Sequence, residues 1–160
     1  MVEEGSVEVR GVPTPKAATL VGRDTPIELA AAGPGYVGRG ALKLEGALEA
    51  FPVAVEGRRA LDAGASTGGF TEVLLQQGAS SVVALDVGRG QLDDRLRRDE
   101  RVVVMERTNL RHVTPEDTGG RFPLIVADLS FISLCTVAEA LAGVAEPDAD
   151  LILLIKPQFE

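Results

Sequence analysis

The chain has 160 residues, of which 45% are hydrophobic and 25% charged, the composition of an ordinary globular domain. Its formal net charge of −8 excludes a generally basic nucleic-acid-binding surface, so a nucleic-acid partner would need a local positive patch. No apolar run approaches the roughly 20 residues of a membrane helix, and the acidic first residues lack a signal-peptide core. We therefore expect no membrane span, a cytoplasmic location, and one domain with a short extension.

The N-terminal part is predicted to be a small β unit. Ser6–Arg10 alternates apolar and polar side chains, residues 11–15 form a turn rich in Gly and Pro, and Thr25–Leu29 is a second short strand. Two short strands are too little to fold independently. We therefore expect residues 1–32 to be the end of a longer module, joined by a linker over residues 33–37 to the domain that follows.

A larger α/β domain is predicted over residues 38–160. Its first helix should run from Ala41 to Phe51, because Pro52 ends it. Beyond it, apolar strands are predicted near residues 60–63, 81–85, 102–105, 124–127 and 150–155, and helices near residues 69–77, 91–98 and 132–145. This alternation predicts a parallel sheet with helices on both faces. Ligands of such sheets bind at the carboxyl ends of the strands.

A glycine-rich loop, LDAGASTGGF, joins the first of these strands to its helix. Gly64, Gly68 and Gly69 allow tight turns and close approach of a ligand, and the N–H groups that begin the helix attract an anionic or polar group. Asp86 ends the next strand, 22 residues after Gly64, where a carboxylate accepts hydrogen bonds from ribose hydroxyls. The spacing predicts a nucleoside-containing ligand.

Polar residues also follow each of the remaining strands. They are Glu106–Asn109, Asp128–Phe131 and Lys156–Glu160. Because the carboxyl ends of parallel strands share one edge of a sheet, we expect these side chains to gather around one pocket.

Six segments together resemble the TlyA family: YVGRGALKL, LDAGASTGGF, ALDVG, ERTNLR, ADLSFISL and LLIKPQFE. Members of this family, sometimes labelled hemolysin A, are S-adenosylmethionine-dependent ribosomal RNA 2′-O-methyltransferases related to FtsJ/RrmJ. The resemblance covers Tyr36–Glu160 and implies a Rossmann-like class I methyltransferase fold. Residues 5–29 resemble the end of the S4 RNA-binding domain that precedes the catalytic domain in that family.

The resemblance also implies roles for individual residues. The catalytic residues that match are Lys43, Asp128 and Lys156. The cofactor-binding residues would be Asp62, Gly64, Ser66, Thr67, Gly68, Gly69, Phe70, Asp86, Val87, Thr108, Asn109 and Asp128. The family's fourth catalytic residue, a Glu, belongs beyond Glu160, so the domain is expected to be incomplete at its C-terminal end. Gly38 departs from the family, which more usually has Ser there.

Methyl transfer to a ribose hydroxyl requires an oxygen that is losing its proton. A lysine with the ordinary pKa of about 10.4 cannot accept that proton at neutral pH, whereas burial beside another cation makes an amine a usable base. We therefore expect Lys156 to be the general base, with Lys43 as the neighbouring cation and Asp128 as the group that orients the Lys156 amine and balances its charge. Asp128 and Lys43 are also expected to position the 2′-hydroxyl.

Several alternatives stay open. The chain could methylate a small molecule or a protein, or be a cofactor- or RNA-binding module without activity. An NAD-dependent dehydrogenase is disfavoured because Ser66 replaces the middle glycine of the dinucleotide fingerprint. A pore-forming hemolysin has no support, since no strongly amphipathic basic helix is present.

The family implies ribosomal RNA or ribosomal subunits as partners, and a cytidine of 16S or 23S RNA as the target. A homo-oligomer is not indicated.

Three further residues are of types that often have special roles. His112 has no Cys or His partner at metal-ligand spacing, so no metal site is predicted. Cys135 is expected to be a buried structural thiol. Phe131 is expected either to stack on a base or to pack in the core.

Overall fold

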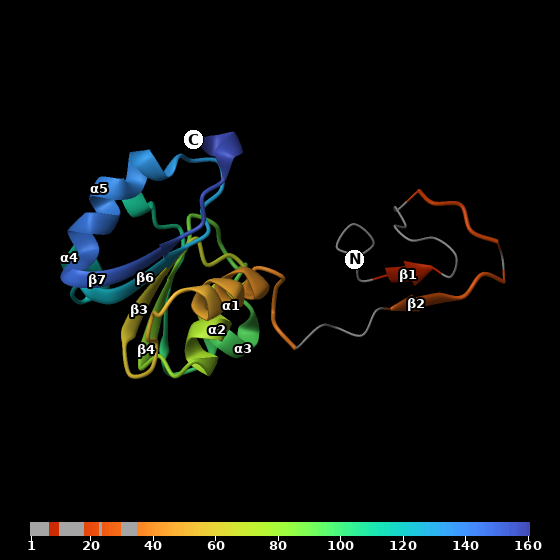
Figure 1. The fold of residues 1–160 in the computed structure, drawn as a ribbon, viewed down its shortest axis with the longest axis horizontal. Coiled ribbons are helices and arrows are strands. Elements are labelled where there is room, and N and C mark those ends of the chain that lie inside the picture. Colours follow the sequence, from red (N-terminus) through yellow and green to blue (C-terminus); the bar gives the residue numbers. More distant parts are fainter. Residues whose placement is uncertain (1–6, 10–17, 23, 30–34) are drawn as a thin grey trace. The chain divides into compact units, whose positions relative to one another are not determined.

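The computed structural model describes residues 7–9, 18–22, 24–29 and 35–160 (Figure 1). The chain divides into two compact units, Met1–Tyr36 and Val37–Glu160. Within the described residues, no helix combines the length and the apolarity needed to cross a membrane.

The first unit contains both predicted short strands. Strand β1 (Val7–Val9) pairs antiparallel with β2 (Ile27–Leu29), with Val7 opposite Leu29 and Val9 opposite Ile27. The turn predicted over residues 11–15 lies outside the described residues, as does the beginning of the predicted linker. The relation of this unit to an S4 domain stays a prediction.

The second unit is built on a five-stranded parallel sheet. Its strands are β3 (Arg59–Ala63), β4 (Ser81–Leu85), β5 (Val102–Met105), β6 (Phe122–Ala127) and β7 (Ala145–Leu153). They lie in the order β5-β4-β3-β6-β7. The order reverses between β3 and β6, which creates the crevice where such sheets bind ligands. The predicted α/β class is confirmed.

Helices cover both faces of this sheet (Figure 1). On one face lie α1 (Ala41–Ala50), α2 (Gly69–Gln76) and α3 (Asp94–Arg97). On the other lie the 3-10 turn η1 (Leu110–His112), α4 (Pro115–Thr118) and α5 (Leu134–Val144). A second 3-10 turn, η2 (Pro157–Phe159), follows β7. Alternation along the strands explains the two layers: Leu61 and Ile125 pack in the α5 core, whereas Asp62 faces α2.

The largest differences from the predictions concern α3, β7 and α4. Helix α3 is shorter than predicted because the carboxylate of Asp93 accepts the N–H of Arg95 and caps the helix at that point. Strand β7 begins directly after α5, five residues before the predicted start at residue 150. Helix α4 was not predicted, although Thr114 and Asp117 form a capping box at its start.

Candidate functional site

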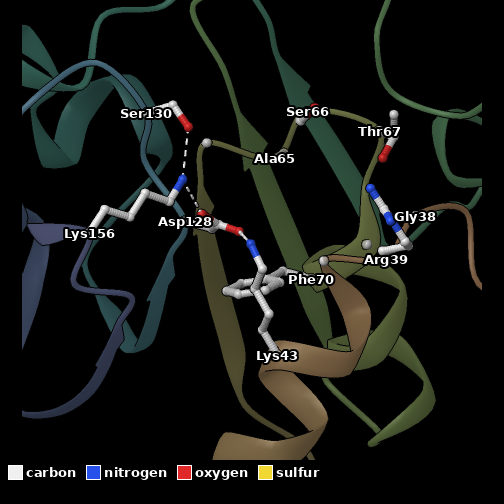
Figure 2. A pocket seen from close by; sticks show the side chains of 13 residues that line it. Gly38, Arg39, Lys43, Ala65, Ser66, Thr67, Phe70, Asp128, Ser130 and Lys156 are labelled. Carbon is white, nitrogen blue, oxygen red and sulfur yellow. Dashed lines mark hydrogen bonds and ion pairs between the residues drawn. The ribbon is translucent and has the colours of Figure 1, made fainter. Parts of the chain in front are cut away.

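A cavity of about 270 Å³ opens at the carboxyl edge of the sheet (Figure 2). Helix α1, the glycine-rich loop after β3, and the segments that follow β6 and β7 form its walls. The predicted site residues that line it are Lys43, Gly64, Ser66, Thr67, Gly69, Phe70, Asp128 and Lys156. The cavity therefore brings all three predicted catalytic residues together with much of the predicted cofactor loop.

Asp128 forms an ion pair with each of two lysines. Lys43 Nζ lies 2.7 Å from Asp128 Oδ2, and Lys156 Nζ lies 2.6 Å from Asp128 Oδ1. The side chains of Asp128 and Lys156 are 17% and 18% exposed, whereas that of Lys43 is 48% exposed. Partial burial alone would raise the pKa of Asp128, but hydrogen bonds and charge from Lys156 and Lys43 outweigh it and hold that pKa below its usual value. Asp128 is thus a carboxylate that fixes two amines in one place.

Two groups in this cavity were not among the predicted catalytic or cofactor-binding residues, although Ser130 belongs to a strand-end segment that was expected near the pocket. Lys156 Nζ donates a hydrogen bond to Ser130 Oγ over 2.8 Å, so the amine is held from two sides. Arg39 lines the cavity beside Gly38 and Thr67 (Figure 2). The available signal for Ser130 was its place two residues after Asp128, at a strand end where polar side chains meet.

Gly38 leaves room for its neighbour. A Cβ added at Gly38 would come within 2.6 Å of Thr67 Oγ1. The Thr67 hydroxyl therefore lies where the larger residue usual in the TlyA family would place its side chain.

The glycine-rich loop has the backbone that a close ligand approach requires. Gly64 and Gly68 have φ of +88° and +99°, and Ser66 between them has a φ of +49°. A Cβ at Gly64 would lie 3.0 Å from the carbonyl oxygen of Asp128. The absence of a side chain at Gly64 thus lets the cofactor loop and the catalytic strand end lie against each other.

Asp86 holds this loop from the neighbouring strand. Its Oδ2 accepts the N–H of Ser66 over 2.9 Å, and its Oδ1 accepts the N–H of Gly88 over 2.7 Å. The Thr108 N–H donates to the Asp86 carbonyl over 3.0 Å. The structure therefore joins Asp86 to the loop and to Thr108, another predicted cofactor residue, although neither Asp86 nor Thr108 lines the cavity.

The remaining cofactor residues lie apart from the cavity. Val87 is 71% exposed, and the Asn109 side chain accepts the N–H of Arg111 at the start of η1. Gly68 caps the start of α2. A cofactor contact by any of these residues stays a prediction.

Asp62 lies behind the loop with its side chain fully buried. Thr71 Oγ1 donates a hydrogen bond of 2.6 Å to Asp62 Oδ2, whereas Oδ1 has no hydrogen-bond partner among the described residues. Burial raises the pKa of Asp62 to about 7, against the hydrogen bonds from Thr71 and with some help from the charges of Asp128 and Asp86. Asp62 does not line the cavity, so a cofactor contact by its carboxylate also stays a prediction.

The expectation that Cys135 is a buried thiol is wrong, and one of the two roles expected for Phe131 is excluded. Cys135 is exposed in the first turn of α5, on the side of the helix away from Val137 and Leu141. Phe131 is 90% exposed. Of the two roles expected for Phe131, packing in the core is therefore excluded.

Among the described residues, no group of three or more His, Cys, Asp or Glu side chains could hold a metal ion.

Comparisons with known proteins agree with this geometry. Residues 36–160 match the family described as FtsJ-like methyltransferase. Over its whole length the chain is 59% identical to a Mycobacterium tuberculosis protein named 16S/23S rRNA (cytidine-2′-O)-methyltransferase TlyA, and it spans 60% of that relative.

Solved structures show the same fold. A Streptococcus thermophilus protein described as a candidate hemolysin superposes with a TM-score of 0.79 at 47% identity, over 85% of this chain and 50% of that one. An S-adenosylmethionine-dependent methyltransferase of Mesorhizobium loti has a TM-score of 0.55 over 68% of this chain and 51% of its own. At 21% identity, that second likeness shows the fold alone.

Proposed function

Because this chain belongs to the FtsJ-like methyltransferase family, we propose that it transfers a methyl group from S-adenosylmethionine to a ribose 2′-hydroxyl of ribosomal RNA. The observation that carries the proposal is the bridge that Asp128 forms between Lys43 and Lys156 beside the glycine-rich loop. The name of the 59% identical relative supports a cytidine of 16S or 23S RNA as the target.

The loop fits such a cofactor. Gly64 lines the cavity and lets the loop pack directly against Asp128, and the carboxylate of Asp86 keeps unused lone pairs that could accept ribose hydroxyls. Ser66, Thr67 and Gly69 would hold the part of the cofactor nearest the lysines. When bound, S-adenosylmethionine supplies an electrophilic methyl group on a sulfonium.

Lys156 is the proposed general base. Its Nζ would accept the proton that the 2′-hydroxyl loses as the ribose oxygen bonds to the methyl carbon. Asp128 and Ser130 fix this nitrogen at 2.6 and 2.8 Å. Once the ammonium has lost its own proton, its lone pair would therefore be held in one direction. General-base assistance of this kind is worth about 100- to 10,000-fold in rate.

Lys43 and Asp128 are proposed to position the hydroxyl. Lys43 projects from α1 and is the more exposed of the two lysines, which leaves its ammonium able to donate to an incoming ribose oxygen. Asp128 keeps both amines on the same side of the cavity. Alignment of oxygen and methyl carbon by these groups would supply much of the rate.

Partners and location follow from this activity. We propose that the chain acts on ribosomal RNA or on ribosomal subunits, in the cytoplasm, and that residues 1–32 are the end of an S4 RNA-binding domain. The 13 arginines and three lysines of the sequence include the cavity residues Arg39, Lys43 and Lys156. This local positive charge suits a phosphate backbone despite the acidic total.

The test combines binding and transfer. Calorimetry should show binding of S-adenosylhomocysteine and none of NAD, and tritiated methyl should pass from S-adenosylmethionine to ribosomal RNA. Lys156→Ala should slow transfer by about 100-fold or more. Lys156→Arg should be equally slow, because an arginine keeps the charge but cannot accept a proton at neutral pH. Near-normal transfer by either variant would exclude Lys156 as the base, and binding without transfer by the wild type would favour a cofactor-binding module.

A further inference from the structure

The segment that carries Lys156 is joined by side chains to the segment that carries Asp128. Strand β7 ends at Leu153, and one more backbone bond, from the Leu154 N–H to the Ala127 carbonyl, extends its pairing with β6. Beyond that point, the described contacts between residues 155–160 and residues 128–134 are made through side chains. Two of them involve Lys156 itself, and the other three involve Phe159 and Glu160.

The Glu160 carboxylate makes the contact furthest from Lys156. Its Oε2 accepts the Ser133 hydroxyl over 2.8 Å, and its Oε1 accepts the Leu134 N–H over 2.9 Å. Ser133 is the N-cap of α5 and Leu134 its first residue, so the negative charge lies where the helix dipole favours it. The hydrogen bonds from Leu134 and Ser133 hold the pKa of Glu160 below its usual value.

An aromatic pair lies between Glu160 and Lys156. The ring centroids of Phe131 and Phe159 are 5.3 Å apart, with the planes tilted by 45°, a favourable arrangement for two aromatic rings. Phe131 is 90% exposed and has a φ of +63°. A large apolar side chain in a left-handed backbone conformation is costly, and such conformations persist where surrounding contacts determine them. The contact with Phe159 is one that would be lost if the two segments moved apart.

We infer that Glu160 and Phe159 are positioning residues that clasp the Lys156 segment to the start of α5, and so keep Lys156 Nζ against Asp128 and Ser130. The significance for catalysis rests on the proposed function, in which Lys156 is the base. Lys156 has a long and flexible side chain. Without the clasp, the segment after Leu154 could swing and carry the amine out of line with its two partners.

The clasp can be tested without any turnover, because the sequence has only three lysines, Lys16, Lys43 and Lys156. Brief labelling of the intact chain with an amine-reactive reagent, read by peptide mass spectrometry, reports the accessibility of each amine. Glu160→Ala should label Lys156 about fivefold faster than the wild type, since two hydrogen bonds are lost, while Lys16 labels at an unchanged rate. Glu160→Gln should restore slow labelling, because an amide can still accept the Leu134 N–H and pair with the Ser133 hydroxyl.

Glu146→Ala is the matched control, since it removes an exposed carboxylate from β7 itself and should leave the labelling of Lys156 unchanged. If Glu160→Ala does not fold, Phe159→Leu, which removes only the ring contact, provides the same test. Unchanged Lys156 labelling in the folded variants would overturn the clasp, as would equal acceleration at Lys16, which would show general loosening.

Transfer assays then connect the clasp to catalysis. Glu160→Ala should lower kcat for methyl transfer about tenfold or more, as misplacement of a catalytic group does, with KM for RNA and affinity for S-adenosylhomocysteine near wild type. Glu160→Gln should recover most of kcat. If the wild type transfers no methyl group, the proposed function fails while the labelling experiment still decides the clasp.

Discussion

Replacing the buried Asp62 by Asn should change how the stability of the protein depends on pH. The carboxyl group is completely buried, and burial raises its pKa to about 7 from an ordinary value of 3.8. Asn keeps the shape and can still accept the hydrogen bond from Thr71 Oγ1. It has no proton to lose in this range, so it isolates the contribution of the titration.

The direction and the size of this pH effect follow from the thermodynamic linkage between protonation of Asp62 and folding. A folded-state pKa above the unfolded value means that the folded protein holds the proton more tightly. The stabilisation is therefore fully present below pH 3.8 and is lost as the pH rises towards about 7. With these two values, the wild type should lose about 2.5 kcal/mol of unfolding free energy between about pH 5 and about pH 8 through this one group.

Urea unfolding of both proteins across this pH range measures the effect. Groups that titrate independently of Asp62 cancel in the difference between wild type and Asp62→Asn. That difference in unfolding free energy should therefore move by about 2.5 kcal/mol in favour of the variant as the pH rises. Asp148→Asn, at an exposed position of β7, should give unfolding free energies parallel to the wild type. If the Asp62→Asn curve were also parallel, the burial argument for Asp62 would be refuted.

Two further substitutions probe the loop and a helix start. Gly64→Ala places a Cβ 3.0 Å from the Asp128 carbonyl oxygen, at a residue whose φ is +88°. The substitution should lower the stability by about 1–3 kcal/mol and weaken the binding of S-adenosylhomocysteine. Thermal-shift measurements with and without this ligand report both effects. Unchanged binding would separate the loop from the cofactor site. Thr114→Ala breaks the capping box of α4 and should lower the urea unfolding free energy by about 1 kcal/mol, with methyl transfer unaffected because α4 does not line the cavity.

Much of the fold was predictable because its signals are local. Apolar runs such as Ser81–Leu85 are buried strands, and these strands are parallel as predicted. The clustering of Lys43, Asp128 and Lys156 was also predictable, since parallel strands end at a common edge and the residues match a family pattern. These expectations depended on periodicity and on residue type at strand ends.

What escaped prediction depends on contacts between distant segments. Cys135 stands in an apolar stretch, but its position on the outer side of α5 leaves it exposed. Ser130 and Glu160 belong to strand-end segments that were expected near the pocket. Their specific partners were not predictable, because they depend on the approach of residues 155–160 to residues 128–134. Phe131 offered reasons both for burial and for exposure. The structure leaves this residue 90% exposed on a left-handed backbone, a conformation that has no sequence signature in a phenylalanine.

The chemical position of the transferred methyl group tests the central claim most directly. Ribosomal RNA incubated with the protein and tritiated S-adenosylmethionine is hydrolysed with alkali, which cannot cut next to a 2′-O-methylated ribose because cleavage needs the 2′-hydroxyl. The account predicts label in alkali-resistant dinucleotides and its loss with Lys156→Ala. Label recovered in mononucleotides would place the methyl group on a base and contradict the role given to Lys43, Asp128 and Lys156.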